Sequence, residues 1–295
     1  MFASIVGKYL VSKELISPAQ FADIKQEMSK VRVKLGLIAI AEGLMTERDA
    51  ERVNNLQAVM DKRFGDIAIE RGYLTSEQVE ALLKKQQNSY LAFAQCLENQ
   101  QLLTVSQLEM LIKDFQEDNN FSNTDIEDLK SDDVDRIVPL YLPMEAREYE
   151  ELACIAVRTI VRLIDNDAYT KKAYFADEVK VNNAALQSME GNAPMYTVFA
   201  GQGQALEPTA STFAKEEFGK VDEDALDAIG ELMNCINGLY ASALSFQKIN
   251  LELCPPEYYP EAQCVKGQNM LVLPIVVKGQ EVSLILSKSK ELTVE

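Results

Sequence analysis

The sequence has 295 residues, long enough for two domains, and its 47% hydrophobic and 25% charged residues are typical of a folded protein. A net charge of −17 argues against a nucleic-acid partner and favours a partner with a basic protein surface. The chain has no histidine, which excludes a histidine base, a serine or cysteine nucleophile activated by histidine, and any histidine-ligated metal site.

The N-terminal part carries no pattern typical of membrane insertion or export. The apolar run from Leu35 to Met45 is broken by Glu42 and is too short to span a bilayer. Lys8 and Lys13 follow the first residues without the apolar core of a signal peptide. The five cysteines show no C-x-x-C spacing, which favours neither a disulfide framework nor a zinc site. We therefore expect a cytoplasmic protein with no membrane partner and no metal or cofactor of its own.

The N-terminal part repeats itself with a period of 29 residues. A shift by this period aligns Gly7, Gly36 and Gly65 with Ala94. In the same register a serine or threonine is followed three residues later by glutamine or aspartate, which is typical of a helix start closed by a capping box. These pairs are Ser17 and Gln20, Thr46 and Asp49, Thr75 and Gln78, and Thr104 and Gln107. The pattern predicts an all-helical domain over residues 1–116, built from four stacked helix-turn-helix repeats.

Two of the repeats, residues 34–57 and 63–86, resemble the helical N-terminal domain of type II secretion and pilus ATPases. Some members of that family bind cyclic di-GMP. Arg63 keeps the arginine of the family's Arg-Leu-Gly start, whereas Lys34 replaces it in the other copy and Phe64 replaces the leucine. The resemblance leaves two roles open, a docking module and a cyclic di-GMP sensor. A DNA-binding helix-turn-helix is disfavoured by the acidic balance of the chain.

An acidic segment follows the repeats. Between Glu117 and Asp135 the chain carries eight acidic side chains against Lys130 alone. Such a run is typical of a solvated tether, so we expect a linker over residues 117–138 and a second domain over residues 139–295.

The second domain shows both helical and strand patterns. Apolar residues spaced by three and four predict a helix over residues 144–164, and a further helix is predicted over 209–218. Strands are predicted at four places, residues 173–181, 196–200, 270–277 and 282–286, with the last two joined in a hairpin. Residues 182–193 are interpreted as a loop. The order predicts an α+β domain with a mostly antiparallel sheet backed by two long helices.

The longest predicted helix covers residues 224–244 and has an apolar stripe, which we expect to be buried, and a polar ridge. The stripe consists of Leu226, Ile229, Met233, Ile236, Tyr240 and Leu244. Beside it run Asp227, Glu231, Asn234 and Gly238 at helical spacing, flanked by Gly230. Glu231 and Asn234 are one turn apart, so their side chains lie on one face. We expect Asp227, Gly230 and Gly238 to form the contact surface for a partner, because glycines allow close backbone approach.

A Glu-x-x-Asn pair on a helix is usually a solvated flank, but a longer pattern surrounds this one. Asp227, Glu231, Asn234 and Pro256 follow one another with three, two and 21 residues between them, and Gly238 lies four after Asn234. This arrangement resembles the signature of the CheC/CheX family of chemotaxis phosphatases, and the resemblance covers about residues 145–295. The motif occurs once, as in CheX-like members, whereas CheC-like members carry it twice.

The resemblance implies an enzyme that hydrolyses the aspartyl phosphate of a CheY-like response regulator. Asn234 would hold the attacking water and Glu231 would pair with a lysine of the regulator, so both are the expected catalytic residues. Asp227 and Pro256 would shape the ends of the helix. The regulator would supply the magnesium ion, and the family leads us to expect a homodimer formed through the sheets. The alternative is a non-catalytic adaptor that binds a receiver domain through the same surface.

Overall fold

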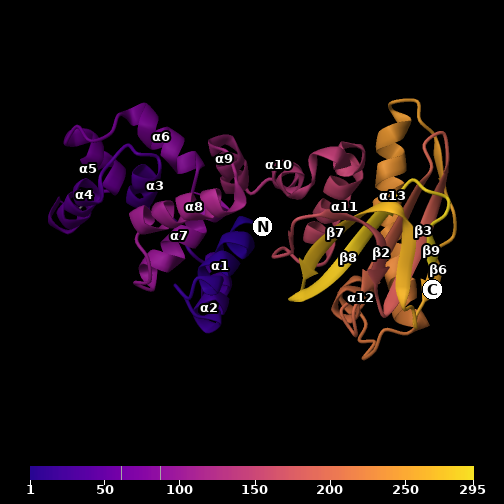
Figure 1. The fold of residues 1–295 in the computed structure, drawn as a ribbon. Coiled ribbons are helices and arrows are strands. Elements are labelled where there is room, and N and C mark those ends of the chain that lie inside the picture. The colour runs from indigo at the N-terminus through magenta and orange to yellow at the C-terminus, as the bar shows by residue number, and fades with distance from the viewer. Residues whose placement is uncertain (61, 87) are drawn as a thin grey trace. The chain divides into compact units, whose positions relative to one another are not determined.

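The computed structural model describes residues 1–60, 62–86 and 88–295, and only the backbone of residues 58 and 59. The chain forms a helical unit, Phe2–Asp133, and an α/β unit, Val134–Glu295 (Figure 1). The predicted fold class, an all-helical repeat region followed by an α+β region, is confirmed. Within the described residues, no helix combines the length and hydropathy needed to cross a membrane.

Each predicted repeat forms two helices. The pairs are α1 (Phe2–Ser12) with α2 (Pro18–Met28), α3 (Leu35–Ala41) with α4 (Glu47–Met60), α5 (Phe64–Glu70) with α6 (Ser76–Lys84), and α7 (Ser89–Asn99) with α8 (Val105–Asn119). Complete capping boxes start α2, α6 and α8. At α4 the Thr46 hydroxyl instead donates to the Asp49 carboxylate at 2.6 Å.

Two of the three repeated glycines, Gly7 and Gly36, lie where an aromatic ring packs on the first helix of a repeat. A Cβ atom added at Gly7 would lie 2.0 Å from the Phe21 ring, and one added at Gly36 would lie 3.0 Å from the Phe64 ring. Phe64 belongs to the next repeat. The glycine period therefore marks the sites at which neighbouring elements pack closely, and it explains why the repeats stack.

The acidic segment differs from the predicted tether. It contains α9 (Asn123–Ser131), which begins at a capping box of Ser122 with Asp125. Ile126 and Leu129, three residues apart, are buried on the helical unit, and Leu129 is 0% exposed. The predicted linker over 117–138 is thus wrong for this stretch, because two apolar residues on one helix face outweigh the charges on the others. The boundary between the units lies after Asp133.

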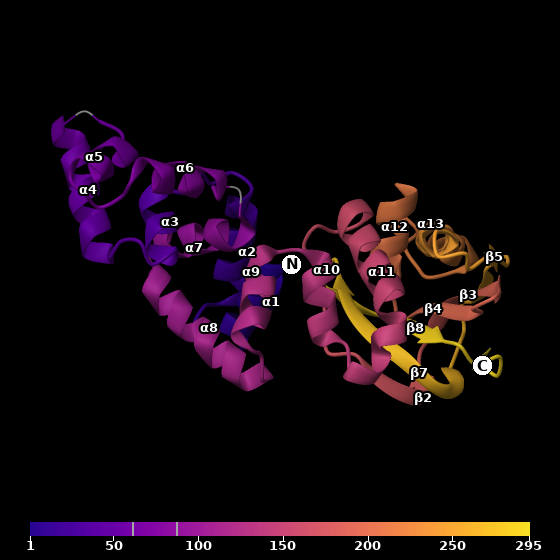
Figure 2. The same ribbon diagram turned by 90° about the horizontal axis from the view of Figure 1, so that it is seen from above.

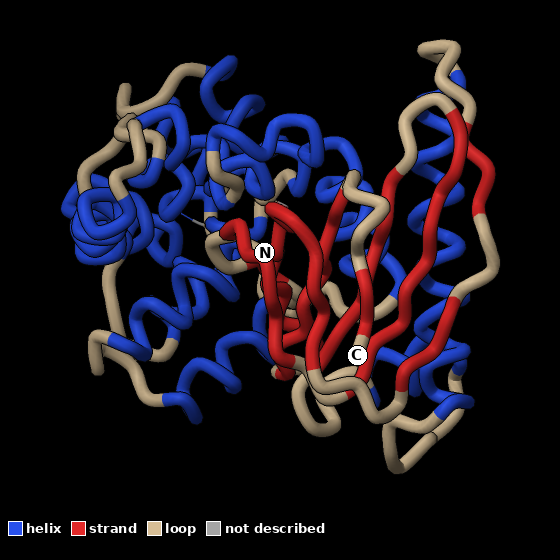
Figure 3. The backbone as a smooth tube through the Cα atoms, turned by 45° about the vertical axis from the view of Figure 1, so that its right-hand side comes forward, coloured by secondary structure: helices blue, strands red, loops and turns tan. Residues whose placement is uncertain are grey.

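The α/β unit places its helices on one side of a sheet. The helices are α10 (Val134–Ile137), α11 (Glu150–Leu163), α12 (Glu207–Ala214) and α13 (Glu223–Ser245), with 3-10 turns η1 (Val138–Tyr141) and η2 (Met144–Tyr149). Figure 2 shows α11, α12 and α13 along one side of the strands, and Figure 3 shows α13 behind them. Both long helices predicted from the sequence are therefore present.

The sheet is antiparallel and has the order β1-β7-β8-β4-β3-β5. Its strands are β1 (Tyr169–Thr170), β2 (Tyr174–Lys180), β3 (Asn183–Gly191), β4 (Met195–Gly201), β5 (Leu251–Leu253), β6 (Glu257–Tyr259), β7 (Cys264–Val277), β8 (Gln280–Ser287) and β9 (Thr293–Val294). Strands β2 and β9 pair with β7, and β6 pairs with β3. The predicted hairpin is confirmed: Lys278 and Gly279 turn it with φ of 51° and 79°, as the twist of paired strands requires.

The face of the sheet opposite α13 holds an apolar cluster of its own. Val198, Val272 and Ile285 point to this face and are buried, together with Val181 and Leu292 from the segments that curl over it. These residues are covered within one chain. The expected homodimer through the sheets therefore gains no support from exposed apolar area on this face, and it stays a prediction.

The predicted loop over residues 182–193 is wrong. Most of it is β3, which pairs with β4 along its length and with β5 and β6 on its other side. The residues from Asn183 to Gln187 are all buried. A strand covered on both faces shows no alternation of apolar and polar residues, so the period-two signal was absent.

Candidate functional site

Helix α13 carries the predicted motif and begins one residue before the predicted start. Asp222 caps it by accepting a hydrogen bond from the Ala225 backbone N–H at 3.2 Å. That bond is the main cause that holds the pKa of the Asp222 carboxyl below its usual value. The apolar stripe of α13 faces α11 and the sheet, which leaves the polar ridge on the exposed side.

Glu231 and Asn234 lie together on the exposed side of α13. Glu231 is exposed and Asn234 is half-buried. The Asn234 Nδ2 atom is 3.4 Å from Glu231 Oε1, which is a weak hydrogen bond from the amide to the carboxylate. The predicted pair is therefore accessible, and it presents one fixed negative charge beside one carboxamide.

The Asn234 oxygen is held from inside the unit by a residue that sequence reasoning missed. Gln187 of β3 donates its Nε2 hydrogens to Asn234 Oδ1 and, at 2.8 Å, to the backbone carbonyl of Cys254. Its Oε1 accepts from Asn237 Nδ2 at 2.7 Å, and Asn237 also donates to Thr197 Oγ1 at 2.8 Å. Gln187 is 1% exposed and Asn237 is 0% exposed. The sequence does carry one indication of this network: Asn237 is a polar residue on the apolar side of the helix, one turn after Asn234, and a buried amide needs hydrogen-bond partners.

Asp227 and Gly230 contact the segment that contains Pro256. The Tyr258 hydroxyl donates to Asp227 Oδ1 at 2.8 Å. A Cβ atom at Gly230 would lie 2.6 Å from the Tyr258 hydroxyl oxygen and 3.1 Å from Pro256 Cβ. Burial, and then the bond to Asp227, raises the pKa of Tyr258 to about 12. Gly230 is buried, so the prediction that it contacts a partner is wrong: the chain's own tyrosine occupies the space that the glycine leaves.

Further along α13 the surface is open. Gly238 is half-buried, and a Cβ atom added there would meet nothing within 4 Å. Phe246, at the end of α13, is 88% exposed, which makes it the most exposed large hydrophobic side chain among the described residues. We define the α13 edge by the residues Asp224, Asp227, Glu231, Asn234, Gly238, Ser242 and Phe246. Its side chains are acidic toward the start of the helix, small in the middle, at Gly238 and Ser242, and apolar at the end, at Phe246.

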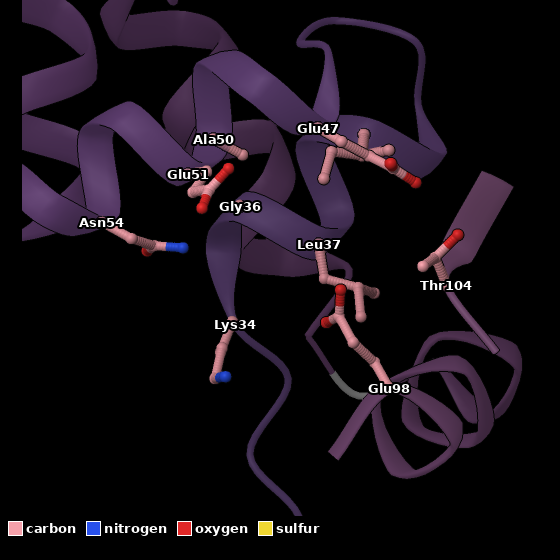
Figure 4. Close-up of a pocket in the computed structure, with 10 residues that line it drawn as sticks. Lys34, Gly36, Leu37, Glu47, Ala50, Glu51, Asn54, Glu98 and Thr104 are labelled. Atoms are coloured by element: carbon pink, nitrogen blue, oxygen red, sulfur yellow. The ribbon is translucent and has the colours of Figure 1, made fainter. Parts of the chain in front are cut away.

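The helical unit contains two adjoining hollows around Lys34. The one in Figure 4, of about 270 Å³, is lined by Lys34 and by three carboxylates, Glu47 and Glu51 of α4 and Glu98 of α7. This charge balance repels phosphate groups. The other hollow includes Arg32 beside Lys34. Arg63, on which the cyclic di-GMP alternative depends, is not among the described residues that line either one. The structure gives that ligand no support.

Comparisons with known proteins find similarity in fold. No protein-family model matches the chain, and no curated protein matches it in sequence. A chemotaxis protein CheX from Desulfovibrio desulfuricans is 13% identical with a TM-score of 0.42, over 50% of this chain and 98% of that chain. A CheC-like protein from Shewanella oneidensis is 14% identical with a TM-score of 0.42, over 48% and 98%.

A third solved structure contains a partner. CheX from Borrelia burgdorferi, in complex with CheY, beryllofluoride and magnesium, is 14% identical with a TM-score of 0.35, over 50% of this chain and 96% of that chain. The CheX-like similarity covers the C-terminal half of the chain. The resemblance to CheC/CheX-type proteins predicted from the motif is confirmed as a similarity of fold.

Proposed function

We propose that the α/β unit hydrolyses the aspartyl phosphate of a CheY-like receiver protein, with Glu231 and Asn234 as its catalytic residues. The observation that carries this proposal is the accessible carboxylate and carboxamide, 3.4 Å apart, on the helix α13. The spacing of Asp227, Glu231, Asn234 and Pro256, which resembles the CheC/CheX signature, supports the choice of substrate.

The proposed reaction requires the attacking water to be aligned with the phosphorus atom, and it does not require a base that removes a proton from the water. A carboxamide neither gains nor loses a proton near neutral pH, so Asn234 can hold a water but cannot deprotonate it. In the proposed step the water oxygen bonds to phosphorus while the bond from phosphorus to the aspartyl oxygen breaks. The aspartate leaves as a carboxylate, and the released phosphate keeps both water protons. Positioning supplies much of the rate in such transfers, and the receiver's magnesium ion would supply the rest of the activation.

The α13 edge has the charge pattern of a docking surface for a basic patch. Asp224, Asp227 and Glu231 gather negative charge beside Asn234, and the whole chain has a net charge of −17. Charge complementarity of this kind speeds association and sets the register of docking. Glu231 would pair with a lysine of the receiver. Gly238 leaves room for the receiver's backbone, and Phe246 offers an apolar contact.

Phosphate release from a CheY-like receiver phosphorylated with acetyl phosphate tests the proposal. The parent chain should accelerate release, and Asn234→Ala should lose most of the acceleration while it still binds the beryllofluoride-loaded receiver. Glu231→Gln should weaken binding. Glu252→Gln, which removes the same charge from an exposed site on β5, is the matched control and should behave like the parent.

The second candidate is a non-catalytic adaptor that binds a receiver through the α13 edge. The exposed Phe246 beside an acidic ridge favours it, because both features promote binding and neither promotes hydrolysis. Binding of the loaded receiver by the parent chain, without faster phosphate release, would select this reading and reject the phosphatase.

A further inference from the structure

The orientation of the Asn234 amide follows from the position of a backbone carbonyl oxygen, which is an acceptor in every hydrogen bond it makes. The Cys254 carbonyl only accepts hydrogen bonds, so the Gln187 atom 2.8 Å from it is the amide nitrogen. This places the Gln187 oxygen toward Asn237, whose Nδ2 donates to it at 2.7 Å. Because the same Gln187 nitrogen also donates to Asn234, the Asn234 atom that it meets is the oxygen.

We propose that Gln187 is a positioning residue that makes Asn234 present hydrogen-bond donors to the substrate. With its oxygen bound inside, Asn234 directs its Nδ2 group toward the α13 edge and Glu231. A reversed Asn234 would turn its amide hydrogens toward those of Gln187 and leave buried donors without acceptors, which proteins avoid. The catalytic part of the proposal rests on the phosphatase function, whereas the orientation does not.

The outward polarity decides how a water is held. An Asn234 N–H would donate to one lone pair of the water oxygen, which leaves the other lone pair for attack on phosphorus. The same N–H could donate to a phosphoryl oxygen on which charge builds up. In both cases an oxygen in place of the outward nitrogen would fail. Asn234→Asp, which keeps the shape and exchanges this nitrogen for oxygen, should therefore lose activity as Asn234→Ala does.

Two measurements on the full chain test the orientation and its consequence separately. The first is ¹⁵N relaxation of the Asn234 side-chain amide, whose signal is identified by its loss in Asn234→Asp. In the parent the amide should have a clearly higher order parameter than in Gln187→Met, where it should fall below about 0.6, the range of flexible groups. Asn183→Ala is the control, because it removes another buried amide from β3. The Asn183 Nδ2 group donates to the Gly203 carbonyl and not to α13.

The second measurement is the rate of phosphate release from the acetyl-phosphate-treated receiver. Gln187→Met should lower kcat about tenfold or more at nearly unchanged KM, because the misplaced group acts after docking. Asn183→Ala should leave both unchanged. Asn234→Asp keeps the size and shape of this half-buried side chain and leaves Gln187 in place, so it tests the polarity even if Gln187→Met does not fold.

The outcomes distinguish the two proposals. An unchanged Asn234 order parameter in Gln187→Met overturns the positioning role, as does an activity of Asn234→Asp close to that of the parent. A mobile amide with an unchanged kcat also overturns it. A parent chain that does not accelerate phosphate release overturns the phosphatase function, and the catalytic part of the Gln187 proposal with it, while the relaxation data still decide the orientation.

Discussion

Replacing Gly230 by alanine tests the geometry around the motif most directly. The new Cβ atom would lie 2.6 Å from the Tyr258 hydroxyl oxygen and 2.7 Å from Cε1 of the same ring. Both distances are shorter than van der Waals contact allows, so the ring has to move. Gly238 lies eight residues later on α13, where an added Cβ atom meets nothing within 4 Å. Gly238→Ala is therefore a matched control for the same substitution in the same helix.

The magnitudes favour a clear difference between the two variants. Alanine stabilises a helix interior by about 1 kcal/mol relative to glycine, so Gly238→Ala should stabilise the α/β unit by that amount. At Gly230 this gain is opposed by overpacking, which costs about 1–3 kcal/mol, or by displacement of Tyr258 and loss of its bond to Asp227, worth about 1 kcal/mol. Gly230→Ala should therefore be less stable than Gly238→Ala by about 1–3 kcal/mol.

Hydrogen exchange of α13 peptides at increasing urea concentration measures this difference within the full chain. It reports on the α/β unit alone, which matters because a chain of two units need not unfold in one step. Equal stability of the two variants would refute the placement of the Tyr258 ring over Gly230. Such a result would also mean that Gly230 is open to a partner, as the sequence predicted.

Three further outcomes are expected. Leu129→Ala should destabilise the helical unit by about 2–5 kcal/mol when hydrogen exchange is followed in peptides of that unit, whereas a residue in a solvated tether would give no change. The Tyr258 pKa, followed by NMR of ¹³C-labelled tyrosine, should lie near 12 and fall in Asp227→Asn, although burial still raises it. Because the folded state holds this proton more tightly, Tyr258 contributes stability that is present below its ordinary pKa of 10.0 and is lost as the pH rises toward 12. Phe246→Ser should change stability by less than about 0.5 kcal/mol yet weaken receiver binding, and that binding should also weaken with rising salt; binding unaffected by either change would place the docking surface elsewhere.

The elements that local signals specify were predicted well. The capping pairs start α2, α6 and α8, and the Lys278-Gly279 turn closes the β7–β8 hairpin. The predicted motif helix matches α13 within a residue at each end. In each case the interacting residues lie a few positions apart, so the pattern that forms the element is visible in the sequence.

The errors arose where burial depends on distant parts of the chain. Residues 182–193 were interpreted as a loop because β3 is covered on both faces and shows no alternation. The acidic segment was interpreted as a tether because its charges outnumber Ile126 and Leu129, although those two residues decide where it packs. Gly230 was assigned to a partner because no sequence pattern brings Tyr258 over it.

The sequence by itself determined the helical repeats, the α+β class and the Glu231–Asn234 pair, since each follows from residues spaced along one element. The tertiary structure alone decided which groups of that pair are offered to solvent. Gln187 lies 47 positions from Asn234, and only the pairing of β3 within the sheet brings the two amides together. Hydrogen bonds between side chains depend on atomic placement, which spacing along the chain does not encode, so the polarity of the site is a property of the fold.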